Sequence, residues 1–326
     1  MRVFVTGATG FVGANVVRAL LTRGDTAVCP VRKSNRCVEG LALTLIAGDL
    51  TDRVAMARAM AGCDGVLHVA GTFEPGPGGP ERMRALHVDA TAALLGAAKD
   101  VGITRFVTCS SSVTVGFGSR DRPGDEETPY NATAIYGATG GFRAYHDTKL
   151  ESEQITADAG GIIVNPDYVL GAWDVKPTSG QLLVSIANGI VPAYPKGGKC
   201  FIDAGDCAIG HILALERGVP ARRYLLGNWN ASYREFMTLC AQAAGRRPPL
   251  IAVPSRLISV AGRVGSLLQR FDPHRFVGLD GHVLLAMQQE RYRTGRRAQV
   301  ELGLPMTPLA DSVAAALGWF RENGYV

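Results

Sequence analysis

RVFVTGATGFVG, residues 2–13, is the stretch of sequence that decides the fold. Residues 2–6 predict a short buried strand, and the apolar spacing of 11–21 predicts a helix. Between them a first glycine permits a tight turn, a second lets the backbone approach a pyrophosphate, and a third lets helix and strand pack closely. The start of a helix also attracts anions. We therefore expect a dinucleotide to bind at Gly7, Thr9, Gly10, Phe11, Val12 and Gly13.

Strands and helices alternate along the first half of the chain. Apolar runs predict further strands at 27–31, 43–47, 65–70, 105–110 and 162–165. Helical spacing covers 55–60, 82–99 and 145–157, whereas 116–144 is rich in glycine and proline and predicts a long loop. Repeated β-α-β alternation is typical of a parallel sheet with helices on both faces. The predicted fold class is α/β, a doubly wound Rossmann sheet with a smaller, mainly helical substrate domain.

The length of 326 residues suits two domains. Beyond Pro166 the composition turns to Trp, Tyr, Pro and Gly, and a helix at 207–216 and a strand at 224–226 indicate a return to the sheet. We expect a dinucleotide-binding domain of residues 1–166 and 201–229. The substrate domain is expected at 167–200 and 230–305, followed by a C-terminal helix within 306–326.

Composition excludes several classes of protein. Hydrophobic residues make up 47% and charged residues 19%, which excludes disorder of the whole chain. The net charge of +5 is scattered, so no nucleic-acid partner is expected. The seven cysteines lack CxxC spacing, which argues against a metal site and for a reducing compartment. Without a signal peptide or a membrane span, the expected location is cytoplasmic.

The residues after the second expected strand indicate whether NAD or NADP is bound. An acidic residue there would bind the ribose 2′-hydroxyl of NAD, but residues 31–36 read VRKSNR and contain no acid. Arg32, with Lys33 or Ser34, could hold a 2′-phosphate, so NADPH/NADP+ is expected rather than NAD. A solvated basic loop is the alternative. Asp49 and Leu50 follow the third strand, where a carboxylate could accept from the adenine amino group or simply form a turn.

Tyr145 and Lys149 lie four residues apart on an expected helix and therefore on one face. A free phenol has a pKa of about 10, and a neighbouring Lys charge favours the phenolate. Three serines, Ser110 to Ser112, end the fifth strand at the sheet edge that carries the glycine turn. Together they predict acid-base chemistry by Tyr145 on a substrate oxygen held by a serine.

These motifs resemble the extended short-chain dehydrogenases/reductases, in their dihydroflavonol 4-reductase-like and NAD-dependent epimerase/dehydratase branch. The resemblance covers nearly the whole chain and rests also on residues 48–50, 68–71, 165–166, 201–206 and 223–227. It implies Ser112 as the catalytic hydroxyl, with Ser111 as the fallback. It implies Tyr145 as proton donor or acceptor, and Lys149 as the holder of the nicotinamide ribose. It implies further cofactor contacts at Val69, Ala70, Gly71 and Pro166.

Three positions bear on the details. His87 stands where the family often has Asn, and either joins a proton relay or packs in the core. Asp167 replaces a small residue after Pro166, and lies near the nicotinamide or points to solvent. Nucleotide-sugar enzymes of the family place an Arg before the segment at 201, where this chain offers only Lys199. Six aromatic residues either line a substrate pocket or pack within and between the domains. They are Phe73, Tyr130, Tyr136, Tyr168, Trp173 and Tyr194.

The predicted function is an NADPH-dependent reductase or dehydrogenase that interconverts a carbonyl and a secondary alcohol on a small, partly apolar substrate. A nucleotide-sugar epimerase or dehydratase with a transiently reduced cofactor is the alternative. A non-catalytic NADP(H) sensor is disfavoured, because sensors of this fold commonly lose the Tyr or the Lys. The resemblance also implies a homodimer paired through the helices at 82–99 and 145–157.

Overall fold

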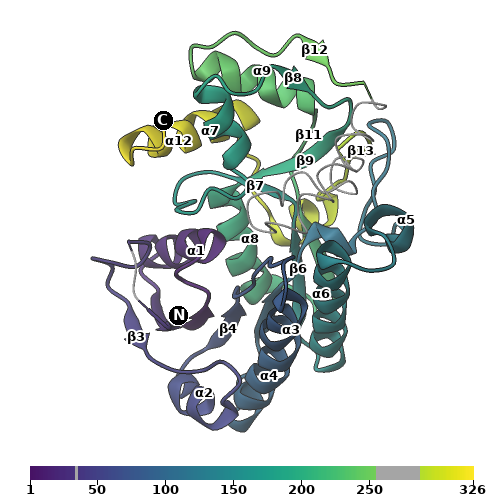
Figure 1. Cartoon of the computed structure of the whole chain (residues 1–326). Coiled ribbons are helices and arrows are strands. Elements are labelled where there is room, and N and C mark those ends of the chain that lie inside the picture. The colour runs from purple at the N-terminus through teal and green to yellow at the C-terminus, as the bar shows by residue number, and fades with distance from the viewer. Residues whose placement is uncertain (34–35, 255–286) are drawn as a thin grey trace.

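A seven-stranded parallel sheet forms the larger part of the computed structural model, which describes residues 1–33, 36–254 and 287–326 (Figure 1). The strand order is β10-β6-β5-β4-β1-β2-β3. The strands are β1 (Arg2–Thr6), β2 (Thr26–Pro30), β3 (Thr44–Ile46), β4 (Gly65–His68), β5 (Phe106–Cys109), β6 (Ile162–Pro166) and β10 (Arg223–Leu226). The order reverses at β1 and β4, where open α/β sheets place their ligand crevice. The doubly wound fold predicted from the sequence is confirmed.

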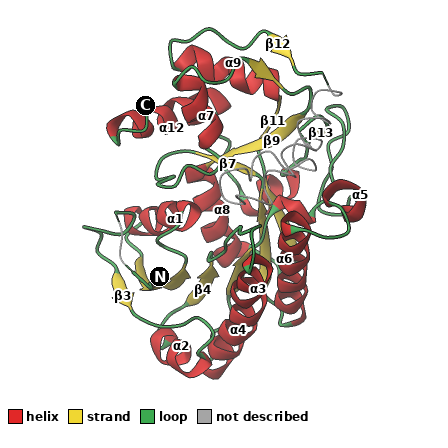
Figure 2. Cartoon of the chain, in the orientation of Figure 1, coloured by secondary structure: helices red, strands yellow, loops and turns green. Residues whose placement is uncertain are grey.

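Helices cover both faces of this sheet (Figure 2). They are α1 (Phe11–Thr22), α2 (Arg53–Met60), α3 (Gly79–Arg84), α4 (Ala90–Asp100), α6 (Gly141–Asp158) and α8 (Ala204–Arg217). Successive side chains of β1 point to opposite faces of the sheet, so they belong to two different parts of the core. Val3 and Val5 pack with residues of α1 and α8, whereas Phe4 packs with Met60 of α2 and Leu94 of α4.

The helix expected at 82–99 contains a π-helical turn, η1 (Ala85–Asp89), between α3 and α4. The loop expected at 116–144 holds a short helix, α5 (Ala132–Tyr136), and the first turn of α6. The side chain of Asn131 caps α5 by accepting from the N–H of Ala134, and α5 stops at Gly137 with φ +79°. The prediction of a continuous loop, which rested on glycine and proline content, is therefore wrong here. A five-residue helix can form between a capping side chain and a terminating glycine.

A second, smaller sheet carries strands from distant parts of the sequence. Its strands are β7 (Tyr168–Leu170), β9 (Gly198–Asp203), β11 (Trp229–Ser232) and β13 (Glu290–Arg291). A separate two-stranded sheet pairs β8 (Ala193–Tyr194) with β12 (Ile251–Ala252). The helices α7 (Gln181–Ala187), α9 (Tyr233–Ala243) and α12 (Leu309–Glu322) pack against it. Residues 201–203, expected in the dinucleotide-binding part, extend β9 instead, so the return to the first sheet begins with α8. Within 230–305, residues 255–286 lie outside the described residues, and the remainder holds strands as well as helices.

Part of the segment 82–99, which was expected to pair two copies of the chain, packs inside the chain. Its Leu94 and Ala97 lie in the core with Phe106 of β5. The homodimer and the cytoplasmic location remain predictions. Among the described helices, none is long and apolar enough to cross a bilayer.

Candidate active site

The glycine turn between β1 and α1 makes two close backbone contacts that exclude a side chain. Gly7 has φ +75°, and a Cβ there would lie 2.7 Å from the amide nitrogen of Ala70. A Cβ on Gly13 would lie 2.1 Å from the carbonyl oxygen of Gly7. Helix α1 begins at Phe11, directly after Gly10, so the amides of its first turn have no partner within the helix. The turn therefore fits the pyrophosphate of a dinucleotide, as the sequence predicted.

Two further segments follow β4 and β2, the strands on either side of β1. Val69, Ala70 and Gly71 follow β4, and the close approach of Gly7 to Ala70 places them against the turn. Arg32 and Lys33 follow β2 and are exposed, while Ser34 lies outside the described residues.

The carboxylate of Asp49, after β3, is used by its own turn. It accepts from the N–H and the hydroxyl of Thr51, each at 2.9 Å. These two bonds, together with the charge of Arg32, lower the pKa of Asp49. The turn geometry is the simpler of the two interpretations given to this residue, and an adenine contact by Asp49 or Leu50 remains a prediction.

Helix α6 brings the acid-base residues to the ends of β4 and β5. The side chain of Ser111 lies near enough to the phenol of Tyr145 to act on its pKa. The ammonium of Lys149 is buried and donates to the carbonyl oxygen of Cys109 at 2.9 Å. A Cβ on Gly71 would lie 3.0 Å from Lys149 Nζ, so this ammonium also lies beside the loop after β4. Tyr145, Lys149 and Ser111 thus meet at the sheet edge that carries the glycine turn.

The side chain that acts on the pKa of Tyr145 is that of Ser111, the fallback, and the catalytic role of Ser112 that the resemblance implies stays a prediction. Strand β5 ends at Cys109, and Ser112 already begins the short helix η2 (Ser112–Thr114). Ser111 precedes this helix as its cap, with its hydroxyl accepting from the N–H of Val113 at 3.3 Å. Strand alternation therefore does not extend through the three serines, because the chain turns into η2 after Ser111.

Burial keeps the phenol of Tyr145 protonated. It raises the pKa of Tyr145 to about 12, although the side chain of Ser111 acts in the opposite direction. The expected lowering of this pKa by Lys149 is therefore wrong for the structure described, where desolvation dominates. Burial also lowers the pKa of Lys149, against the charge of Glu153. Burial therefore favours the neutral form of both side chains.

His87, in the π turn, has both ring nitrogens occupied. Nε2 accepts from the N–H of Thr72 at 3.2 Å, so Nδ1 carries the proton and donates to Thr148 Oγ1 at 2.9 Å. Burial and the charge of Lys149 lower the pKa of His87 to about 2. The ring centre of His87 lies 5.6 Å from that of Tyr145 in an edge-to-face contact. A neutral imidazole with two fixed partners favours a positioning role over a proton relay.

Glu153 is a central residue of the site that the sequence analysis did not find. Its buried carboxylate accepts from the hydroxyls of Ser110 and Thr114, and from Asn165 Nδ2 at 2.7 Å. It also forms an ion pair with Arg223. These contacts join α6 to β5, η2, β6 and β10. The signal was available, because Tyr145, Lys149 and Glu153 follow one another at four-residue intervals on one helix face.

The six candidate aromatic residues divide into two groups. The ring centre of Phe73 lies 5.3 Å from that of Tyr145, and the phenol of Tyr130 donates to the carbonyl oxygen of Val113. The ring of Tyr136 stacks on that of Phe142, with 6.4 Å between the ring centres. These residues surround the site. The other three belong to the packing of the smaller part, where Tyr168, Trp173 and Tyr194 contact its core.

Asp167 does not point to solvent. Its side chain is buried and accepts from Arg293 Nη1 at 2.7 Å, and Lys199 Nζ lies 3.9 Å from its other oxygen. Pro166, directly before it, ends β6. The carboxylate is therefore held by cations at the end of β6, and its negative charge is balanced there.

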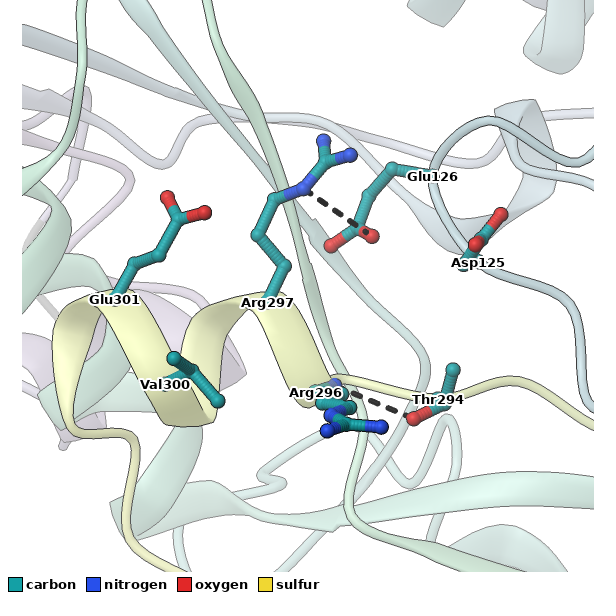
Figure 3. A pocket seen from close by; sticks show the side chains of 7 residues that line it. All are labelled: Asp125, Glu126, Thr294, Arg296, Arg297, Val300 and Glu301. Atoms are coloured by element: carbon teal, nitrogen blue, oxygen red, sulfur yellow. Dashed lines mark hydrogen bonds and ion pairs between the residues drawn. The ribbon is translucent and has the colours of Figure 1, made fainter.

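A pocket lies beside the π turn η4 (Ala298–Leu302), and Tyr145 is not among the residues that line it (Figure 3). Its charged side chains largely pair with one another and with their neighbours. Arg297 pairs with Glu126 and Glu127, and Glu301 pairs with Arg222. Because these charged side chains are already paired, the pocket is not a candidate catalytic site.

Comparison with known proteins agrees with this geometry. The model of the NAD dependent epimerase/dehydratase family matches residues 3–227. A dihydroflavonol 4-reductase-like protein of Synechocystis sp. is 34% identical over 336 residues, covering 99% of this chain and 95% of its own. Sterol demethylase protein B of Methylococcus capsulatus is 29% identical over 332 residues, with 100% of each chain covered.

The same similarity extends to solved structures. The crystal structure of the protein gox2253 superposes with a TM-score of 0.84 at 32% identity, with 99% of each chain covered. The glycine turn, the Tyr145–Lys149 pair and these matches agree on one assignment. The chain belongs to the NAD-dependent epimerase/dehydratase family of extended short-chain dehydrogenases/reductases, and is an NAD(P)-dependent oxidoreductase acting on CH-OH/C=O groups.

Proposed function

We propose that the chain is an NADPH-dependent reductase or dehydrogenase that interconverts a carbonyl and a secondary alcohol on a small, partly apolar substrate. The observation that carries this proposal is the half-buried, protonated phenol of Tyr145, whose pKa Ser111 affects, one helical turn from the buried Lys149. Such a phenol can give its proton to a carbonyl oxygen. The aromatic rings around it, such as Phe73, favour a substrate with apolar surface.

Each residue of the site has a distinct task in this proposal. Tyr145 donates the proton in reduction and removes it in oxidation, and Ser111 holds the same substrate oxygen. Lys149 binds the ribose beside the reacting carbon, and His87 and Glu153 keep the helix and the serine turn in place. The nicotinamide supplies or accepts the hydride when it is bound. The residues that would hold the cofactor are Gly7, Thr9, Gly10, Phe11, Val12, Gly13, Arg32, Lys33, Asp49, Leu50, Val69, Ala70, Gly71, Tyr145, Lys149 and Pro166.

A stoichiometric assay separates this function from its alternatives. A reductase consumes one equivalent of NADPH for each alcohol formed from a panel of aryl and alicyclic ketones. An epimerase or dehydratase would convert a nucleotide sugar with no net loss of cofactor, and a sensor would bind NADP(H) without turnover. Conversion of a nucleotide sugar at constant NADPH would therefore move the function to the epimerase class.

The choice of cofactor is tested by Arg32→Ala. A charge-assisted contact with the 2′-phosphate contributes about 1.5–3 kcal/mol, so the Kd for NADPH should rise by roughly 10- to 100-fold. The Kd for NADH should stay within about twofold, because NADH has no 2′-phosphate. Both constants are measured by fluorescence titration, with the exposed Arg234→Ala as control. Wild-type enzyme that binds NADH more tightly than NADPH would contradict the assignment.

The two serines are distinguished by parallel alanine variants. Ser111→Ala removes the hydroxyl that acts on the pKa of Tyr145 and should lower kcat by about 10²-fold, the lower end for acid-base networks. Ser112→Ala should lower it several-fold at most. Steady-state kinetics with one reducible ketone decide between them. The reverse order of effects would restore Ser112 to the role inferred from sequence.

The two reaction directions should differ in their pH dependence. The pKa of Tyr145 is raised, so the protonated form dominates below about 12 and reduction should show no loss from this group between neutral and mildly alkaline pH. Oxidation needs the phenolate, whose population grows about tenfold for each pH unit below that pKa. Profiles of kcat/KM for alcohol oxidation from pH 7 to 10 should rise throughout. A plateau close to pH 7 would mean that Tyr145 titrates near neutrality.

A further inference from the structure

Arg291, in β13, is a buried arginine without a carboxylate partner among the described residues. Its relative exposure is 8%, and its Nη2 donates to the phenol of Tyr136. Its Nε is buried and has no hydrogen-bond partner within 1–33, 36–254 and 287–326. The guanidinium lies 4.9 Å from the ring centre of Phe117 and 5.4 Å from that of Tyr136. Because a guanidinium has five N–H donors, the bond to Tyr136 uses only a small part of its capacity.

The charges around Arg291 leave an excess of positive charge. Asp167 is the carboxylate of this cluster, and its ion pair with the fully buried Arg293 cancels one cation. Arg293 is further fixed by donating to the carbonyl oxygens of Val115 and Gly116. Lys199, the neighbour of Arg291 in the strand register, lies 3.9 Å from Asp167 and has a side chain 26% exposed. Within the part of the chain that the structure describes, this cluster thus holds the three cations Arg291, Arg293 and Lys199 with the carboxylate of Asp167.

Uncompensated buried charge is costly, and proteins usually pair it. The pKa of Lys199 falls to about 8, chiefly through burial and against the attraction of Asp167, with Arg291 and Arg293 adding repulsion. The cluster would therefore gain from an anion that neutralises Arg291 and Lys199 together.

Contacts between side chains connect this cluster to the acid-base residues. Tyr136, which accepts from Arg291, is stacked with Phe142. Phe142 lies 4.5 Å from Phe73 between ring centres, and Phe73 lies 5.3 Å from Tyr145. The cluster also borders the end of β6, where Asp167 follows Pro166. The excess charge and the proton donor therefore belong to one region, with aromatic rings between them.

We propose that Arg291, assisted by Lys199, binds an anionic oxygen group, a carboxylate or a phosphate, on the carbonyl substrate. This inference rests on the proposed function and refines its substrate class to a carbonyl compound with an apolar ring and an anionic group some distance from the reacting carbon. It differs from the sequence-based expectation of a less charged substrate, which considered Lys199 alone. Arg291 is far from Lys199 in sequence, and only the strand pairing of β13 with β9 joins them.

Three matched ketones test the proposal: 4-acetylbenzoate, 4-acetylphenyl phosphate and the neutral methyl 4-acetylbenzoate. Wild-type enzyme should reduce at least one of the two anions with a kcat/KM about tenfold or more above that of the ester. The better anion identifies the source as a carboxylate or a phosphate. Arg291→Gln should abolish this preference while changing the kcat/KM of the ester by no more than about twofold. The exposed Arg296→Gln is the matched control and should keep the preference.

A second measurement does not depend on turnover. Each anion should raise the melting temperature of the wild-type enzyme with NADP+ present, and this shift should be lost in Arg291→Gln. If that variant does not fold, Lys199→Gln, which changes a partly exposed side chain, should weaken the same shift. Equal reduction of the ester and the anions, or an anion preference that survives Arg291→Gln, would overturn the proposal. Failure of all three ketones to consume NADPH would count against the proposed function, while the melting shifts still decide the anion site.

Discussion

Tyr145→Phe should lower kcat for carbonyl reduction by about 10²–10⁴-fold, the usual contribution of a general acid. The substitution removes only the phenol oxygen, on whose pKa the side chain of Ser111 acts. The ring remains to contact Phe73 and His87, so folding and NADPH affinity should stay close to those of the wild type. The measurement is single-turnover reduction followed by NADPH absorbance, alongside a cofactor titration.

Tyr194→Phe is the matched control, since Tyr194 is a half-buried tyrosine that contacts the core of the smaller part. It should retain nearly the full wild-type rate. Near-full activity in Tyr145→Phe would remove Tyr145 from the proton transfer. A loss of NADPH affinity equal to the loss of rate would mean that the phenol serves binding and not chemistry.

Glu153→Ala should lower the free energy of unfolding by about 3–5 kcal/mol, the range for removing one partner of a buried ion pair. The variant leaves the guanidinium of Arg223 without its acceptor and deprives Ser110, Thr114 and Asn165 of theirs. For a chain of this size the melting temperature should fall by roughly 10 °C. Circular dichroism melts measure the change directly.

Glu151→Ala is the control on the same helix. Glu151 is exposed and pairs with Arg84, and exposed ion pairs contribute about 0–1 kcal/mol. Its melting temperature should lie close to that of the wild type. A Glu153→Ala protein as stable as Glu151→Ala would show that the buried carboxylate is not the residue that joins the strands to α6.

The sequence predicted the parts of this molecule that local rules determine. The glycines at 7, 10 and 13 and the alternation of apolar segments predicted the parallel sheet, because turn geometry and burial act over a few residues. The Tyr145–Lys149 pair was predicted for the same reason, since helix periodicity alone places both residues on one face. Glu153 follows from the same periodicity and was overlooked because its partners lie on other strands.

The remaining features depend on contacts that no local pattern encodes. The position of Ser111 depends on where β5 ends and η2 begins, which the run of three serines does not reveal. The neutral state of His87 depends on burial and on its partners Thr72 and Thr148. Arg291 becomes relevant only when β13 pairs with β9, after a chain separation of about 90 residues.

The π turn at 85–89 contains one more residue than an α-helical path through the same space needs, because its hydrogen bonds close after five residues instead of four. A deletion of one residue there would let the turn close as ordinary α-helix without breaking the chain. The segment 79–84 would then keep its rotation about the helix axis relative to 90–100, because the π turn holds the extra residue without changing the phase of the flanking turns. Met83 would keep its buried position and Arg84 would still face Glu151. Insertions and deletions are usually tolerated in loops, but in this protein one helix can change length by a residue. The change would fall in the turn that holds His87 against Thr72 and Thr148.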